Sequence, residues 1–456
     1  MKHLFSLKND LLPLLKLAIP FALTGLLQSS VFFFETVFLA HVSPDVLAAG
    51  SLATWLFGTI AVIFFGILSA INILVAFNHG AKNTLAISYI VRDGLLLSVL
   101  LVVPIFLLLW NMSPVFKLFG QHANIIALTS IYLRAFAWGL LPSFVMAALL
   151  QFIMGLGHTR IIVIFSIFSV GINLFFSYAL IFGKFAMPTL GIAGAGWGMT
   201  ISNWISVFVL IAYVGYKKNY RVYLQHVFHI SKPRYIGELL QVGLPMGAMF
   251  CIEVGFFFAM TLIMGSISSQ ILAANQIAFQ YLGTLIGIVF SIAQAVTVRM
   301  GHLLGAHEVN LAARTTYAGL CLSAIYMLII AVCYWCFSST LISIDFDINA
   351  AQNKEIISFA KQFLYAAAVF QLFEAMRITL FGALRALKDT QFTLLTSIIS
   401  FWLIALPLGY LLASYFAMGG LGLWCAMVLS ALVGASLLFW RFEVKMKRHC
   451  ERSAAI

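Results

Sequence analysis

Long runs of apolar residues follow one another along nearly the whole chain, separated by short polar segments. Each run is about 20 residues or longer, enough for an α-helix to cross roughly 30 Å of hydrocarbon. The alternating pattern of a membrane β-barrel is missing. The runs predict twelve transmembrane helices, at residues 11–40, 47–77, 87–110, 124–151, 160–183, 191–215, 237–264, 271–300, 314–336, 356–384, 392–415 and 420–441. Prolines within these runs mark expected bends: Pro20, Pro104, Pro142, Pro245 and Pro407.

Composition supports an integral membrane protein, because 63% of the 456 residues are hydrophobic and only 9% are charged. A soluble domain of this composition would expose mostly apolar surface. Lys16 interrupts the first run and no small-residue cleavage site follows, so we expect an uncleaved helix there rather than a signal peptide. The six cysteines are scattered, and the close pair Cys333 and Cys336 lies in a predicted helix. No disulfide framework is therefore expected.

The positions of the charges orient the chain, whose formal net charge is +12. With both termini in the cytoplasm, 20 of the 26 Lys and Arg fall on the cytoplasmic side, five fall on the other side and Arg377 lies within a helix. This distribution follows the positive-inside rule. Attraction to anionic lipid headgroups accounts for the charge without a nucleic-acid partner. We therefore predict a multi-pass protein with both termini in the cytoplasm.

The sequence contains an internal repeat. A shift of 225 positions gives 11 identities in the 44 residues from 17 to 60, among them Pro20 with Pro245 and Ser43 with Ser268. A shift of 231 aligns residues 185–187 with 416–418, so the second half carries about six extra residues, most simply near 340–355. Internal symmetry of this kind is typical of repeat architectures.

Six predicted spans in each half mean that both copies enter the membrane from the same side. We expect an all-α protein of two six-helix lobes related by a pseudo-twofold axis along the membrane normal. The predicted boundaries are residues 1–215 for the N-terminal lobe, 216–236 for a basic cytoplasmic linker, 237–441 for the C-terminal lobe and 442–456 for a basic cytoplasmic tail. Transporters built in this way hold substrate near the midplane, between the repeats.

Three carboxylates fall within predicted helices: Glu35, Glu253 and Glu374. Each costs on the order of 2.5–3.5 kcal/mol at a helix centre when ionised, and such residues are usually functional. None has an acidic counterpart in the other half: the residues aligned with them are Met260, Gln28 and Ser143, respectively. If carboxylates were needed only to pack this fold, both copies should carry them. The asymmetry therefore favours a functional role.

The chemistry of these carboxylates leaves two ions open. Loss of hydration favours the protonated form of a carboxyl group, which suits proton uptake on one side and release on the other. Facing carboxylates at Glu253 and Glu374 could instead hold Na⁺ with hydroxyl or carbonyl partners. Arg377, one turn after Glu374, either forms a structural ion pair with it or competes with an incoming cation. Asn173 and Ser177 share a helix face and either join helices or act beside Glu35.

Five stretches of the chain resemble the multidrug and toxic compound extrusion (MATE) transporters, in particular their NorM-type branch: LAIPFALTGLLQSSVFFFETVFLAHVS, GKFAMPTLGIAGAGWG, VGLPMGAMFCIEVGFFF, QAVTVRMGHLLG and FEAMRITLFGALRALKDT. The resemblance covers nearly the whole chain. It implies twelve helices in two lobes that form a V, in a monomer of the bacterial inner (plasma) membrane. It further implies antiport, the export of amphiphilic, often cationic drugs in exchange for H⁺ or Na⁺, with no cofactor.

The resemblance also assigns roles by position. Glu35 matches the acidic residue of the family's first helix and Asn173 its partner on the fifth, while Glu253 and Glu374 match the acids of the second lobe that are associated with cation binding. We expect Asn173, Ser177, Arg377 and Gln28 to act as supporting polar residues. The branch usually has Asp at 35 and 374, Asn at 177, a tyrosine at 370, where this chain has Phe, and a neutral residue at 377. A lost hydroxyl and an added positive charge favour H⁺ over Na⁺ in the second lobe.

Other functions fit the sequence less well. A flippase or exporter of a lipid-linked or polar metabolite, as in related families of the same superfamily, commonly has extra helices and a strongly cationic cavity, and neither is evident. An intramembrane enzyme would need a motif such as HExxH, and His307-Glu308 lacks the second histidine. A receptor that binds without transporting is the remaining alternative.

Overall fold

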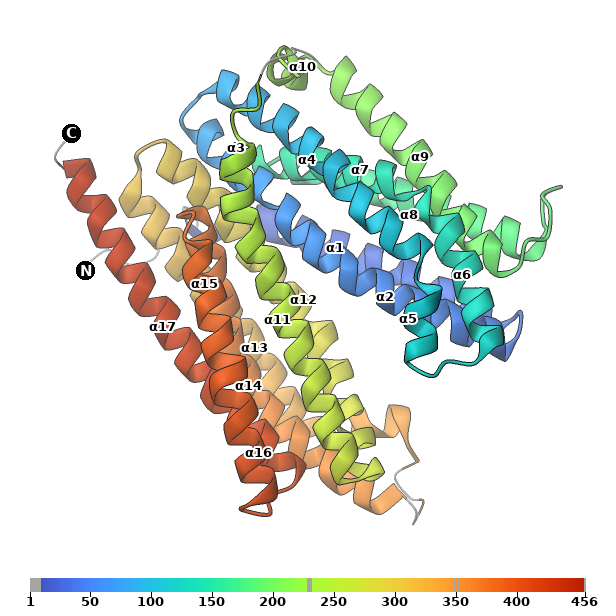
Figure 1. The fold of residues 1–456 in the computed structure, drawn as a ribbon. Coiled ribbons are helices and arrows are strands. Elements are labelled where there is room, and N and C mark those ends of the chain that lie inside the picture. Colours follow the sequence, from blue (N-terminus) through green and yellow to red (C-terminus); the bar gives the residue numbers. More distant parts are fainter. Residues whose placement is uncertain (1–9, 228–231, 348–349, 351–352, 455–456) are drawn as a thin grey trace. The chain divides into compact units, whose positions relative to one another are not determined.

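The computed structural model describes residues 10–227, 232–347, 350 and 353–454, and every regular element within them is a helix (Figure 1). Eleven helical segments are long and apolar enough to cross a membrane. A twelfth span is formed by two helices, Ala123–Ala137 and Leu140–Gly155, which meet at 53°. The predicted all-α membrane architecture is therefore confirmed for these residues.

The helices have the following bounds: α1 Leu12–Ala40, α2 Pro44–Leu68, α3 Ala70–Gly80, α4 Thr84–Trp110, α5 Ser113–Leu118, α6 Ala123–Ala137, α7 Leu140–Gly155, α8 Thr159–Phe182, α9 Ile192–Tyr216, α10 Lys218–Leu224, α11 Ile236–Ile267, α12 Ser269–Gly305, α13 Val309–Asp345, α14 Lys354–Ala386, α15 Thr390–Ser397, η3 Ile398–Ala405, α16 Leu406–Ser414 and α17 Gly420–Ala454. Helices α2 and α3 make one span, as do α15, η3 and α16. The residues predicted as a basic tail continue α17 as a helix up to Ala454.

The chain divides into two compact units. Residues 23–247 form the N-terminal unit, and the residues before Leu23 join those from Ala248 onward in the C-terminal unit. This division differs from the predicted lobes, because α1 and α11 each contribute to both units. Residues 228–231 of the predicted linker and four residues near the predicted insertion, 348–349 and 351–352, lie outside the described residues.

Local packing explains why α1 and α11 are shared in this way. At Gly243 and Gly247 of α11, an added Cβ would lie 2.4 and 2.8 Å from the carbonyl oxygens of Ile67 and Ile63 in α2, so glycine permits this close approach. The start of α1 is tied instead to α13, where Arg314 Nη2 lies 2.5 Å from Asp10 Oδ2. Each helix therefore begins in one unit and ends in the other.

The repeat predicted from the sequence is visible in the backbone. Ser43 and Ser268 cap α2 and α12 in the same extended conformation, and each hydroxyl accepts a hydrogen bond from the N–H three residues later, at 3.2 and 3.1 Å. Residues at equivalent positions also share the left-handed conformation, which is uncommon outside glycine. These pairs are Lys82 and His307, Gly157 and Lys388, and Ala186 and Ala417.

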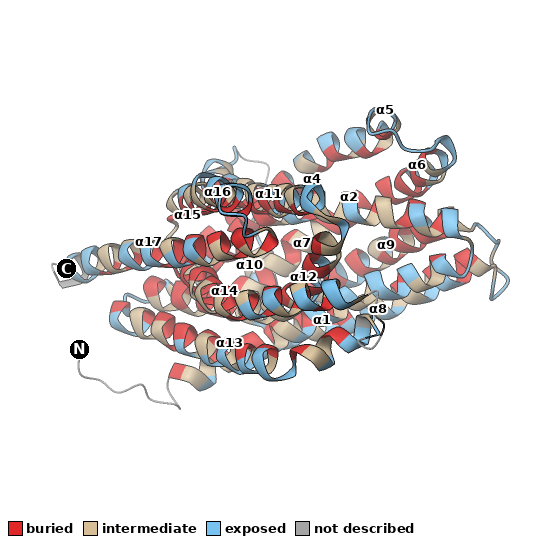
Figure 2. Ribbon diagram, turned by 90° about the horizontal axis from the view of Figure 1, so that it is seen from below, coloured by how far each residue is buried: buried red, intermediate tan, exposed pale blue. Residues whose placement is uncertain are grey.

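Long helices have exposed faces (Figure 2), and many of the exposed residues on them are large and apolar. On α13 these are Ile325, Leu328, Ile329 and Val332, which are 46–59% exposed and recur at helical spacing. Helix α4 carries a similar stripe from Leu96 to Leu107. A soluble protein rarely exposes such continuous apolar stripes, whereas lipid covers them without cost.

The break between α6 and α7 frees backbone carbonyl groups within a candidate membrane span, where each would be costly if it lacked a partner. Helix α9 supplies the partners. Thr200 Oγ1 donates to Ala135 O at 2.8 Å and Trp204 Nε1 to Trp138 O at 3.2 Å. Gly139 at the break also lets α9 approach, because an added Cβ would lie 2.9 Å from Thr200 Cα. The single predicted helix 124–151 is thus two helices stabilised by a third.

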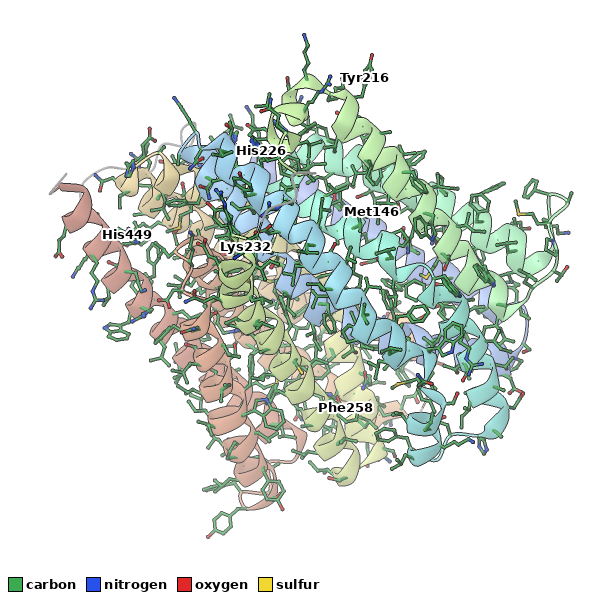
Figure 3. All side chains as sticks on the ribbon, turned by 45° about the horizontal axis from the view of Figure 1, so that its top comes forward. Met146, Tyr216, His226, Lys232, Phe258 and His449 are labelled. Atoms are coloured by element: carbon green, nitrogen blue, oxygen red, sulfur yellow. The ribbon has the colours of Figure 1, made fainter. Side chains whose placement is uncertain are left out.

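A buried aspartate fixes the start of α11. Asp93 of α4 is inaccessible to solvent, and its Oδ2 accepts hydrogen bonds from the backbone N–H groups of Arg234 and Tyr235, both at 2.7 Å. Arg92 Nε donates to the other oxygen at 2.8 Å. Figure 3 labels Lys232, whose carbonyl accepts from Arg92 Nη2 at 3.1 Å. The carboxylate thereby holds the end of the linker against α4.

We expect Asp93→Ala to lower the free energy of unfolding by about 2–4 kcal/mol, because two backbone N–H groups and Arg92 lose a buried, charged acceptor. Thermal unfolding in detergent micelles measures the change. The control is Asp45→Ala, which removes an exposed carboxylate that accepts a hydrogen bond from Asn124 and should cost less than about 1 kcal/mol. Equal losses in the two variants would contradict a clamping role for Asp93.

Candidate functional site

Glu35 is buried in the N-terminal unit, where it is 2% exposed. Tyr132 of α6 donates its hydroxyl hydrogen bond to Glu35 Oε1 at 2.8 Å. The same hydroxyl lies 3.3 Å from the sulfur of Met199 on α9. Glu35 Oε2 is buried and has no hydrogen-bond partner among the described residues. One oxygen is thus held in place, and the other is open to bind a proton or a donor group.

Asn173 and Ser177 lie on one face of α8, and both are buried. Helix α8 runs beside the C-terminal part of α1, since the Phe38 ring packs against those of Tyr178 and Phe182 with centroids 5.5 and 6.2 Å apart. The two polar residues therefore lie within about one or two helical turns of the level of Glu35.

No hydrogen bond joins Asn173 or Ser177 to Glu35 in the described part of the chain, and Ser177 Oγ is a second buried atom without a partner there. Close packing of α9 limits the space around Ser177, because a Cβ on Gly198 would lie 2.6 Å from this oxygen. Gln28, predicted as a supporting residue, is exposed. The group that holds Glu35 is therefore Tyr132.

The other two predicted carboxylates meet in the C-terminal unit, around Arg377. Glu374 binds the guanidinium group with both oxygens, at 2.8 Å from Nε and 2.6 Å from Nη2. Glu253 Oε1 lies 2.9 Å from Nη1, and the Ser397 hydroxyl donates to the same oxygen at 3.0 Å. Glu253, Glu374 and Arg377 are 7, 4 and 3% exposed. This buried group, which we name the carboxylate–arginine triad, has a formal net charge of −1 when all three residues are ionised.

A π-helix completes the surroundings of the triad. Segment η3 widens the helix directly after Ser397 and places the Phe401 ring 4.9 Å from the Arg377 guanidinium carbon, a cation–π contact. Trp402 Nε1 donates to Ile252 O, next to Glu253, at 3.0 Å. π-Helical segments are rare and are often found at functional sites. Here the segment joins the helix that carries Ser397 to the one that carries Glu253.

The triad does not fit a Na⁺ site in this arrangement. A monovalent metal ion needs several oxygens with free lone pairs, whereas both oxygens of Glu374 and one oxygen of Glu253 already bind a guanidinium group. No cluster of three or more His, Cys, Asp or Glu side chains suited to a metal ion occurs among the residues that the structure describes. Phe370, where a tyrosine was expected, packs against Trp424 in an aromatic cluster and offers no ligand atom.

Two members of these sites were missed from the sequence. Tyr132 and Ser397 are uncharged residues in long apolar runs, and their role depends on which way each helix faces. A buried tyrosine in a membrane helix needs a partner for its hydroxyl group, and this need is the only sequence signal for Tyr132.

Comparisons with known proteins agree with this architecture. The family model described as MatE matches residues 20–179 and 245–411, one segment in each half of the chain. A probable multidrug resistance protein NorM of Synechocystis is 30% identical over 445 residues, covering 97% of this chain and 96% of that protein. A multidrug resistance protein NorM of Burkholderia vietnamiensis is 29% identical, covering 96 and 95%.

Solved structures share the fold at lower sequence identity. A MATE protein in a bent conformation superposes with a TM-score of 0.88 at 18% identity, over 97% of this chain and 96% of that one. An outward-facing multidrug resistance MATE family transporter gives a TM-score of 0.86 at 17% identity, over 96% of both chains. The match of the family model to both halves, together with similarity over nearly the full length of both NorM proteins, shows that this chain belongs to the MatE family of membrane proteins.

Proposed function

We propose that the protein is a secondary active multidrug exporter, which moves amphiphilic, often cationic compounds out of a bacterial cell in exchange for protons. It would lie in the inner membrane as a monomer with both termini in the cytoplasm, and expose its substrate site alternately to the two sides. The observation that carries the proposal is the similarity to proteins named multidrug resistance protein NorM over 97% of the chain. Buried carboxylates in both units supply groups that can couple transport to an ion.

Protons are favoured over Na⁺ for two reasons. Glu35 has one oxygen without a partner in the described part of the chain, and it can take up a proton without losing the hydrogen bond from Tyr132. The acids of the C-terminal unit are instead occupied by Arg377. Proton coupling through Glu35 therefore requires no rearrangement of an ion pair.

Reconstitution into liposomes with separately imposed gradients tests the proposal. We expect ethidium, a fluorescent organic cation, to move against its gradient when a pH difference is imposed at equal Na⁺ on both sides. Nigericin, which collapses the pH difference in the presence of K⁺, should stop this movement. Liposomes without protein give the background. Transport driven by a Na⁺ gradient alone would contradict proton coupling, and no movement of any organic cation under either gradient would contradict the exporter.

A further inference from the structure

We propose that Arg377 is a tethered counter-cation, which occupies the position of a monovalent metal ion between Glu253 and Glu374 and makes the C-terminal unit independent of Na⁺. The inference deepens the proposed function and depends on it only for its consequence in transport. It rests on the geometry of the triad.

The contacts of Arg377 explain why this position excludes a metal ion. Three of its N–H groups point at carboxylate oxygens at 2.6–2.9 Å, and the fourth contact, from Nη1 to Ser397 Oγ, is 3.3 Å. A planar guanidinium group binds one carboxylate through two parallel hydrogen bonds and stays charged under all physiological conditions. Any cation that entered would have to displace a covalently attached competitor, whose effective concentration is high.

Hydroxyl groups lie near Arg377, and together with the two carboxylates they could bind a cation if the guanidinium group were absent. Ser397 Oγ already contacts Glu253, and Ser400 Oγ is buried with no hydrogen-bond partner in the described residues. An ideal Cβ on Gly434 of α17 would lie 2.7 Å from Ser400 Oγ and 3.2 Å from Arg377 Cδ, so this hydroxyl borders the arginine side chain. Two carboxylates and two hydroxyls are the hard oxygen ligands that small, weakly polarisable cations prefer.

Removing the guanidinium group should therefore create a cation site. Arg377→Met keeps most of the side-chain length and leaves two buried carboxylates without a counter-charge, a state that is costly unless they take up protons or a cation. Near neutral pH we expect this variant to bind ²²Na⁺ in a saturable manner in detergent, and its melting temperature to rise with NaCl but not with choline chloride. The wild-type protein should show neither effect.

Two further variants separate the tethered charge from other effects of the substitution. Arg377→Lys keeps a cation in place but loses the bidentate geometry, and we expect it to remain insensitive to Na⁺. Arg377→Met with Glu253→Gln removes one of the two acids, and Na⁺ binding should weaken by at least tenfold relative to Arg377→Met alone. If Arg377→Met, Arg377→Lys and the double variant all bound Na⁺ equally, the ion would bind at a position other than the one between Glu253 and Glu374.

The wild-type measurement keeps the test decisive even if Arg377→Met does not fold. Saturable ²²Na⁺ binding by the wild-type protein that is lost in Glu253→Gln would overturn the proposal. So would a folded Arg377→Met variant that does not bind ²²Na⁺ and whose melting temperature does not rise with NaCl. These outcomes are independent of transport. A protein that moves no organic cation would refute the exporter and leave the tethered cation intact, whereas Na⁺ binding by the wild type would refute the tethered cation and leave export intact.

Discussion

Glu35→Gln is expected to reduce proton-driven transport of ethidium to the background of empty liposomes, a fall on the order of 100-fold, the lower end of what a proton-transferring side chain contributes. Glutamine has nearly the same shape, and its carbonyl oxygen can still accept the hydrogen bond from Tyr132. It cannot gain or lose a proton. The substitution therefore removes coupling and leaves the packing of α1 against α6 and α8 in place. Initial rates under an imposed pH difference measure the effect.

Two controls make this result specific. Glu355→Gln changes an exposed carboxylate in the first turn of α14 and should transport at the wild-type rate. The thermal stability of Glu35→Gln should stay within about 1 kcal/mol of wild type, since the glutamine carbonyl oxygen still accepts the hydrogen bond from Tyr132. A Glu35→Gln protein that is stable and transports normally would exclude Glu35 as the coupling group.

The sequence located the charged members of both sites but not the groups that hold them. Glu35, Glu253 and Glu374 stand out because inserting a carboxylate into the membrane within an apolar run costs free energy, and such residues are usually functional. The pairing of Arg377 with Glu374 follows from their spacing of three residues on one helix. The contact of Arg377 with Glu253 joins α14 to α11, and no spacing within a sequence encodes the relative rotation of two helices.

Departures from regular helix geometry were harder to predict for a related reason. A bend is expected at Pro142, yet the helix breaks at Trp138 and Gly139. There the freed carbonyl groups accept hydrogen bonds from α9, which stabilise the break. Segment η3, IISFWLIA, is apolar apart from Ser400, and none of its residues distinguishes a π-helix from an α-helix. The repeat was easier to recognise, because Ser43 and Ser268 cap their helices through local contacts that depend only on neighbouring residues.

The triad offers a second large effect, on stability. We expect Arg377→Met to lower the free energy of unfolding by about 3–5 kcal/mol near neutral pH in the absence of Na⁺, because it leaves two buried carboxylates facing each other. The triple variant Glu253→Gln, Glu374→Leu, Arg377→Met replaces all three charges by neutral groups of similar volume. Its stability should return to within about 1–2 kcal/mol of wild type, since neutral packing commonly replaces a buried ion pair without loss. Thermal unfolding in choline-based buffer compares the two.

Transport by the same triple variant decides why the triad exists. If the charges serve only to hold α11 and α14 together, a stable neutral version should export ethidium as well as the wild type. We expect export instead to fall to background, on the hypothesis that Glu253 exchanges its contact with Arg377 for another partner when the substrate site changes sides, in addition to proton uptake at Glu35; neutral side chains could not make this exchange. A stable triple variant with wild-type transport would assign the triad to packing alone, and Glu35 would then be the sole coupling carboxylate.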